Sequence, residues 1–193
     1  MQQIHCEGCN EISPNYDIIH YGSTDSGYRQ LCTRCYNAEV AKRCGLDDFE
    51  NIRLEPIGID DCTGQKHEFH FRTRLMGSIV SIEAFELHNG SPGGYMFQQV
   101  ADPEEDLFAL LGHLIQKMRR ALAVKHVEDG QLGLQIIDQT VRGRIESDLH
   151  ADLSRPLVVV DGREISWEAF GEMLTAFEGW QFRLHIADPS EEV

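Results

Sequence analysis

Apolar and polar residues alternate in several stretches of the chain, with the two-residue period of a half-buried β-strand. The clearest stretch is residues 68–75, where Phe69, Phe71, Thr73 and Leu75 share one face. Further strands are expected at residues 54–59, 79–87, 95–100, 132–138 and 140–146. Turn-forming residues separate neighbouring strands here, so the pattern predicts hairpins and an antiparallel sheet.

A helical period replaces this alternation after residue 102. Asp102 and Pro103 predict the helix start, because aspartate caps free N–H groups and proline suits the first helical position. One apolar stripe then runs towards Lys125, through Leu107, Leu110, Leu111, Leu114, Met118, Ala121 and Leu122. The stripe predicts a helix of about 35 Å, long enough to cross a whole sheet.

The last forty residues predict a hairpin, a shorter helix and a final strand. Asp161-Gly162 is a hairpin-turn signature and follows an apolar run at residues 157–160. Ser166 is expected to cap the helix, and Gly179 to end it. Residues 180–186 alternate again and are expected to pair as a strand.

Strands that come in hairpins favour an α+β fold over a doubly wound one. The expected architecture is a mostly antiparallel sheet packed by one long and one shorter helix. A short polar connection near residues 46–51 separates two units. Residues 1–48 are expected to form a small zinc-finger module, and residues 53–193 an α+β domain.

Two Cys-x-x-Cys pairs, Cys6/Cys9 and Cys32/Cys35, lie 22 residues apart. Four thiolates in two such pairs suit a tetrahedral Zn²⁺ at about 2.3 Å per sulfur. With no competing histidine or carboxylate, the set favours one structural zinc over a catalytic one. Redox dithiols are the alternative, although a thioredoxin-like motif has a single pair in a βαβ unit.

The elements expected around these cysteines are a knuckle, a hairpin, a second knuckle and a helix that ends at Gly45. Gly8 is expected to adopt a positive φ in the first knuckle. This order resembles the treble-clef class of zinc finger, with a zinc ribbon as the alternative. Cys44 is expected on the inner face of the helix, and Cys62 in a loop or strand.

The whole chain resembles uncharacterised bacterial proteins in which such a module precedes a domain of unknown function. The resemblance rests on both cysteine pairs, on residues 160–168 and on residues 178–180. The resemblance implies zinc ligation by four residues. These residues are Cys6, Cys9, Cys32 and Cys35. No known activity comes with it.

The net charge of the chain and the length of its apolar runs disfavour some classes of function. The 193 residues include 32 acidic and 17 basic side chains, a net charge of -15. Such a chain repels phosphate backbones and anionic membranes, so nucleic-acid binding is the second hypothesis. It would use Arg29, Arg34, Lys42 and Arg43 of the module on phosphates, within a local basic patch that also includes Arg53. No apolar run is long enough to span a membrane, and no signal peptide is apparent. With reduced cysteines, this favours a cytoplasmic location.

The remaining chemical signals are weak. His67 and His70 lack the spacing of a zinc-protease motif, and in a strand they point to opposite faces. An enzyme that uses Asp60, Asp61, His67 or His70 is the third hypothesis. The leading hypothesis is a non-enzymatic interaction or regulatory protein with a structural zinc and a protein partner. A homo-oligomer is left open.

Overall fold

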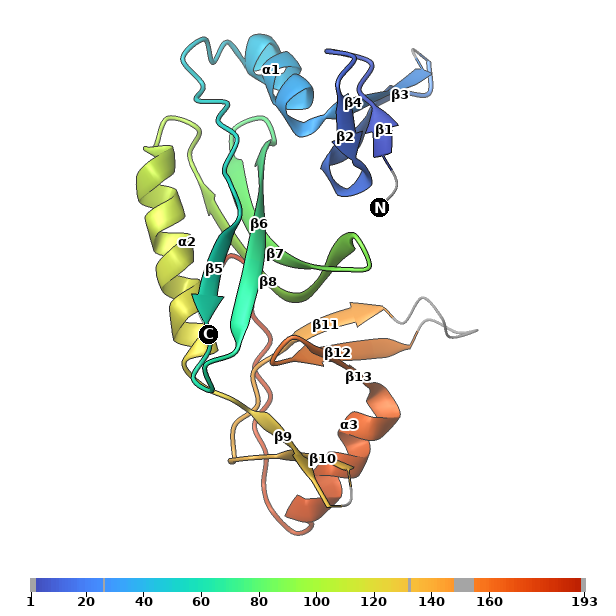
Figure 1. Ribbon diagram of the computed structural model, residues 1–193, viewed down its shortest axis with the longest axis vertical. Coiled ribbons are helices and arrows are strands. Elements are labelled where there is room, and N and C mark those ends of the chain that lie inside the picture. The colour runs from blue at the N-terminus through green and yellow to red at the C-terminus, as the bar shows by residue number, and fades with distance from the viewer. Residues whose placement is uncertain (1–2, 26, 132, 148–154, 192–193) are drawn as a thin grey trace.

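The largest sheet contains four antiparallel strands in the order β5 (Ile57–Asp60), β6 (Lys66–Leu75), β7 (Val80–His88) and β8 (Ser91–Ala101). They are consecutive hairpins, as the alternation predicts. This sheet is seen in a computed structural model that describes residues 3–25, 27–131, 133–147 and 155–191 (Figure 1). The α+β class and the antiparallel pairing are confirmed.

Helix α2 (Leu107–Leu122) covers one face of this sheet (Figure 1). The apolar stripe of α2 packs on the inward side chains of three strands. This main core consists of Phe69, Val80, Ile82, Ala84, Tyr95, Leu107, Leu110, Leu114, Met118 and Leu122. The helix therefore forms where the stripe lies, because burial of an amphipathic face stabilises it.

The predicted ends of this helix were wrong. The N-cap is Asp106, whose side chain accepts hydrogen bonds from the backbone N–H groups of Phe108 and Ala109 at 2.8 and 3.3 Å. Asp102 and Glu105 close a separate turn before it, in which the Glu105 N–H donates to the Asp102 carbonyl. The helix also ends at Leu122 rather than Lys125, since the Leu122 carbonyl accepts from the backbone N–H of Cys62 at 2.9 Å.

The N-terminal part covers some of the opposite face of the sheet. It contains β1 (Gln3–His5), β2 (Ile12–Pro14), the 3₁₀ turn η1 (Asn15–Asp17), β3 (Ile18–Ser23) and β4 (Gly27–Cys32). The ring of Tyr16 meets the ring of Phe85 edge to face, at 5.5 Å between centroids. Arg72 pairs with Glu83 and donates to the Tyr16 carbonyl at 2.6 Å. The face of β6 that carries Arg72 thus contacts the N-terminal part of the same chain.

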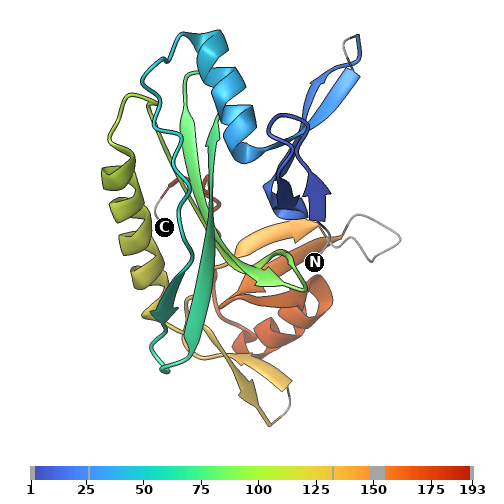
Figure 2. The same ribbon diagram turned by 45° about the horizontal axis from the view of Figure 1, so that its top comes forward.

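Helix α1 (Thr33–Cys44) attaches the module to the end of β6 (Figure 2). Gly45 ends it in the left-handed conformation, as predicted. Val40 and Ala41 of α1 form a small core with Leu75. Asn37 is 1% exposed; its amide donates to the Thr73 carbonyl at 2.8 Å and accepts from the Leu75 N–H at 2.9 Å. One buried amide therefore joins the helix to two backbone groups of the strand.

Replacing Asn37 by alanine is expected to lower the free energy of unfolding by about 2–4 kcal/mol, because both backbone partners lose a buried hydrogen bond. Urea unfolding measures the change. Lys42→Ala, on the exposed side of the same helix, is the control and should stay within about 0.5 kcal/mol of the wild type. Equal effects of the two substitutions would contradict this role for Asn37.

The C-terminal part has a second core. Its strands are β9 (Val127–Gly130), β10 (Gly133–Ile136), β11 (Arg144–Ser147), β12 (Pro156–Val160) and β13 (Arg163–Ser166). β9 and β10 form a hairpin, while β11, β12 and β13 form a three-stranded sheet. Helix α3 (Trp167–Leu174) and the 3₁₀ turn η2 (Thr175–Phe177) follow. The buried centre of this second core consists of Val127, Val158, Val160, Ile165 and Met173. The described residues of 53–193 thus form three sheets and two main cores.

Local signals of this region are confirmed, but the final strand is wrong. Asp161 and Gly162 both have positive φ, 51° and 73°, as the hairpin turn requires. Ser166 caps α3 by accepting from the Ala169 N–H at 3.1 Å. Residues 180–186 pair with no strand in the described part of the chain. Within those described residues, no helix is long and apolar enough to cross a membrane.

Candidate metal centre

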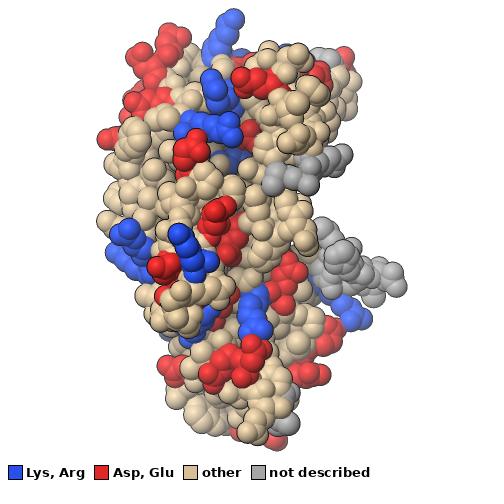
Figure 3. Space-filling view, viewed as in Figure 1, with Lys and Arg blue, Asp and Glu red and all other residues tan. Residues whose placement is uncertain are grey.

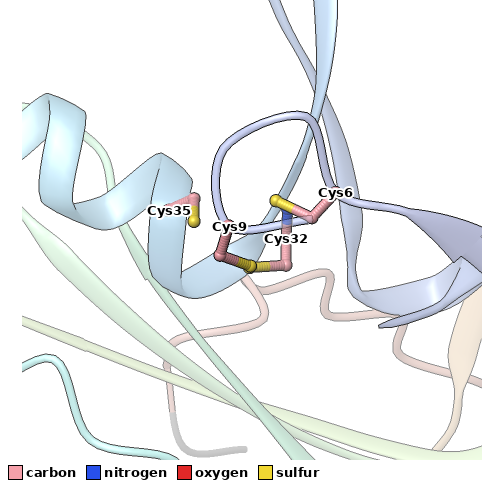
Figure 4. Close-up of side chains that lie close together, drawn as sticks. All are labelled: Cys6, Cys9, Cys32 and Cys35. Carbon is pink, nitrogen blue, oxygen red and sulfur yellow. The ribbon is translucent and has the colours of Figure 1, made fainter. Parts of the chain in front are cut away.

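The four predicted ligands come together between the knuckle and the start of α1. Cys6 and Cys9 lie in the loop that joins β1 and β2, Cys32 ends β4, and Cys35 lies in the first turn of α1 (Figure 4). Glu7 fixes this loop against β4, because its N–H donates to the Gln30 carbonyl at 2.8 Å. The hairpin and the helix start thus set the positions of the thiols.

The sulfur geometry fits a small tetrahedral ion. The four Sγ atoms all lie within 4.8 Å of one another, and those of Cys9 and Cys32 are 3.9 Å apart. A tetrahedral ion with bonds of about 2.3 Å would separate its sulfur ligands by about 3.8 Å. Cys6 and Cys32 are buried, while Cys9 is exposed. The set can therefore bind a metal ion.

Backbone N–H groups prepare one ligand for deprotonation. Burial raises the pKa of the Cys6 thiol, but the N–H groups of Cys32, Cys9 and Gly8 outweigh burial and lower this pKa to about 6. Burial and the neighbouring thiols raise the pKa of Cys35. A dication at the centre would reverse the second effect, because it stabilises each thiolate that contacts it.

Gly8 is needed for space rather than for a special backbone conformation. A Cβ atom at Gly8 would lie 2.9 Å from both Cβ and Sγ of Cys35. The positive φ of this knuckle belongs to Asn10, at 62°, so the expected positive φ at Gly8 was wrong. The first knuckle thus approaches the second closely enough to exclude a side chain.

The remaining cysteines lie apart from this cluster. Cys44 and Cys62 are exposed free thiols, so the expectation that Cys44 faces inward was wrong. The bases of the module are partly engaged: Arg29 pairs with Glu39, and the Arg43 guanidinium lies 5.0 Å from the ring centre of Tyr21. On the face in Figure 3, basic and acidic side chains are interspersed.

Of the residues in the enzyme hypothesis, the structure brings only Asp61 and His67 together. His67 Nδ1 lies 2.8 Å from a carboxylate oxygen of Glu86, and its Nε2 lies 3.4 Å from Asp61. Lys125 Nζ also contacts Asp61, at 3.0 Å. Both imidazole nitrogens therefore face a carboxylate. Asp60 is exposed, and His70 lies on the opposite face of the sheet beside Glu68 and Phe85.

This cluster lines a polar cavity of about 350 Å³ between the two larger cores. Across the cavity, Arg163 makes a bidentate ion pair with Asp129, at 2.9 and 3.0 Å. Asp161 accepts from the backbone N–H groups of His126 and Val127, at 2.7 and 2.9 Å. The charged groups thus pair with one another or with backbone N–H groups. The contact of Lys125 with Asp61 links the residues after α2 to the loop between β5 and β6. No sequence pattern had marked Glu86, Lys125 or Asp161 for this role.

Three family models match the chain. Each is a domain of unknown function: residues 5–47 match DUF7685, residues 50–123 match DUF7686, and residues 126–191 match DUF7713. No curated protein and no solved structure matches. The first match contains all four cysteines, the second the four-stranded sheet with α2, and the third the second core. The second match ends at residue 123 and the third begins at residue 126. At this boundary Lys125 contacts Asp61 of the second match, and His126 donates to Asp161 of the third.

Proposed function

We propose that this chain is a non-enzymatic interaction protein that binds a protein partner through residues 180–186. We call these residues the apolar segment. One structural Zn²⁺, held by Cys6, Cys9, Cys32 and Cys35, maintains the N-terminal module of this protein. The cytoplasm suits it, because a reducing compartment keeps the four thiols available to the metal.

The observation that supports partner binding is the exposure of the apolar segment. Trp180, Phe182, Leu184 and Ile186 are 61%, 92%, 72% and 67% exposed. Single exposed apolar residues are ordinary, but four large ones in consecutive alternate positions form a contiguous patch. Aromatic residues also contribute strongly at the centres of protein interfaces. A protein surface is the partner that would cover this patch.

The cysteine geometry supports the zinc assignment. Four thiolates are typical of structural Zn²⁺, whereas catalytic zinc keeps an open coordination position. The core beside these thiols is small: among the described residues its buried members are Cys6, Leu31 and Cys32. So small a core gains most of its stability from a bound metal. The order knuckle, hairpin, knuckle and helix is the one that suggests a treble clef.

The other two hypotheses have less support. Arg29 and Arg43 are engaged within the module, so an array of bases for phosphate binding has no specific observation in its favour. His67 is held by Glu86 and Asp61 at its two nitrogens, which favours a positioning role within the fold over proton transfer.

A photo-crosslinking amino acid at Phe182 tests partner binding in the organism that encodes the protein. We expect a covalent adduct with a protein, because Phe182 is the most exposed of the four apolar residues. The adduct must form again from purified components. The matched control places the same amino acid at Tyr28, an aromatic residue of the module that is 60% exposed.

An adduct at position 182 and none at position 28 would support the apolar segment as the binding site. The absence of any protein adduct at position 182 would refute the proposed function. Adducts at position 28 alone would move the binding site to the N-terminal module and would also refute it.

A further inference from the structure

We propose that the protein bound by the apolar segment is a second copy of this chain, and that the two segments pair as antiparallel β-strands. This inference rests on the proposed function and adds the identity of the partner and the mode of binding. Pairing of extended segments is a common mode of recognition, because backbone hydrogen bonds give affinity and alternate side chains give specificity.

The segment is attached at both ends and unpaired between them. Before it, the Trp180 N–H donates to the Phe177 carbonyl at 3.0 Å, and the two rings pack edge to face. After it, Lys117 of α2 donates to the carbonyls of Pro189 and Glu191, both at 2.8 Å. Figure 1 shows this red coil between α3 and the end marked C. Ordering such a segment in a complex loses less entropy than ordering a free tail.

Backbone groups along the segment are open for pairing. Within the described part of the chain, residues 181–187 form no backbone hydrogen bond. All seven residues from 180 to 186 are exposed. The strand predicted from the sequence therefore lacks only a neighbouring strand, and a second chain can supply it.

The order of side chains is symmetric about Arg183. Apolar residues occupy positions 180, 182, 184 and 186. Antiparallel pairing centred on Arg183 would place Trp180 opposite Ile186 and Phe182 opposite Leu184, twice each. Such apolar pairs stabilise a sheet. A second copy thus matches the segment along its whole length, as an isologous two-fold contact requires.

Charge also permits this contact. The chain has 32 acidic residues, but residues 180–186 include none. Within residues 180–186 two copies can therefore meet without repulsion between carboxylates, although the whole chain has a net charge of -15. Within the segment, Arg183 lies opposite its own copy, which is unfavourable, since like charges directly opposite destabilise a strand pair. Just beyond the segment, the same register places Glu178 of each copy opposite Asp188 of the other.

The apolar area is sufficient for a weak dimer. With about 150–250 Å² per large side chain, the four exposed residues offer about 500 Å² in each copy. Two copies would bury at most about 1,000 Å² of this apolar area, because a strand pair leaves part of its face uncovered, and this limit is near the lower end of specific interfaces. The dimer is therefore expected to dissociate in the micromolar range, roughly, rather than to be permanent.

Sedimentation equilibrium of the full-length protein between about 1 and 500 μM tests the dimer across the expected range. We expect a concentration-dependent dimer for the wild type and a monomer for Phe182→Glu/Leu184→Glu. The control Ile12→Glu/Tyr28→Glu adds the same charges at exposed apolar residues of the module and should leave dimerisation unchanged. Arg183→Gln should tighten the dimer, by up to about fivefold, because it removes the like-charge pair.

Amide hydrogen exchange distinguishes strand pairing from loose apolar association. Alternate amides within residues 181–186, those that face the partner strand, should become protected as the concentration rises. A wild-type monomer throughout, a dimer that persists in the Phe182→Glu/Leu184→Glu variant, or unprotected amides in the dimer would each overturn the inference. If the chain is monomeric but position 182 crosslinks to a different protein, the proposed function stands and only the second-copy partner is excluded.

Discussion

Removal of the metal with a chelator is expected to unfold residues 5–47 while the four-stranded sheet remains folded. Structural zinc sites contribute apparent binding free energies of about 10–16 kcal/mol in small fingers, more than a core of this size can replace. Among the described residues, the buried members of the core beside the thiols are Cys6, Leu31 and Cys32. Hydrogen exchange by mass spectrometry should show loss of protection in α1, and also at the end of β6, where Asn37 and Val40 pack.

Cysteine variants provide matched controls for this experiment. Cys32→Ser should reproduce the effect of the chelator, and native mass spectrometry should show one Zn²⁺ in the wild type and none in this variant. Cys44→Ser removes an exposed thiol outside the cluster and should keep both the metal and the protection of α1. Unchanged protection of α1 in the metal-free protein would show that the metal does not maintain the fold.

Asp61→Asn is expected to lower the free energy of unfolding by about 3–5 kcal/mol, as for other buried charge networks that lose one member. Asp61 accepts from the N–H groups of Thr63 and Gln65, at 2.8 and 2.9 Å, and from the Thr63 hydroxyl at 2.7 Å. It also contacts Lys125 and His67. An amide cannot accept all these bonds, and it removes the carboxylate that contacts Lys125. Denaturant unfolding with two probes measures the change.

The same variant predicts a pH dependence. Burial raises the pKa of the Asp61 carboxyl, but the Thr63 hydroxyl, Lys125 and two backbone N–H groups outweigh burial and hold this pKa well below its usual range. A depressed pKa stabilises the folded state above the unfolded-state pKa of about 3.9, and this stabilisation is lost as the pH falls below it. The stability difference between the wild type and Asp61→Asn should therefore be largest near neutral pH and shrink in acid.

Asp60→Asn is the control for both measurements. Asp60 is exposed and precedes Asp61 directly, so the change in formal charge is the same. Its effect should stay within about 0.5 kcal/mol. A stability difference for Asp61→Asn that does not change with pH would contradict a role for the charge of Asp61.

The N-terminal module and the sheet are coupled more closely than two domains joined by a linker. Asn37 bonds to backbone groups of Thr73 and Leu75, and Arg72 reaches the carbonyl of Tyr16. Loss of metal would therefore also affect the sheet, through α1 and η1. On the other side of the sheet, Asp61 and Asp161 hold the segment that leads into the second core. The three family models match separate parts of the chain. Buried contacts nevertheless join these parts within one chain.

Short-range features were predictable from the sequence. The ligand set needed only the spacing of Cys6, Cys9, Cys32 and Cys35. The turn at Asp161-Gly162 and the cap at Ser166 depend on backbone groups within a few residues, so local chemistry determines them. The same reasoning placed the N-cap of α2 at Asp102, whereas the packed helix uses Asp106, four positions later.

The sequence by itself determined the four cysteines, the antiparallel hairpins, the apolar stripe of α2 and the alternation of residues 180–186. The tertiary structure decided which polar residues meet and which strands find a partner. Asp61, His67 and Glu86 approach one another because β5, β6 and β7 are neighbours, a long-range fact that no local pattern contains. Residues 180–186 have the pattern of a strand, but a strand requires hydrogen bonds from a neighbour, and the described part of this chain places none beside them.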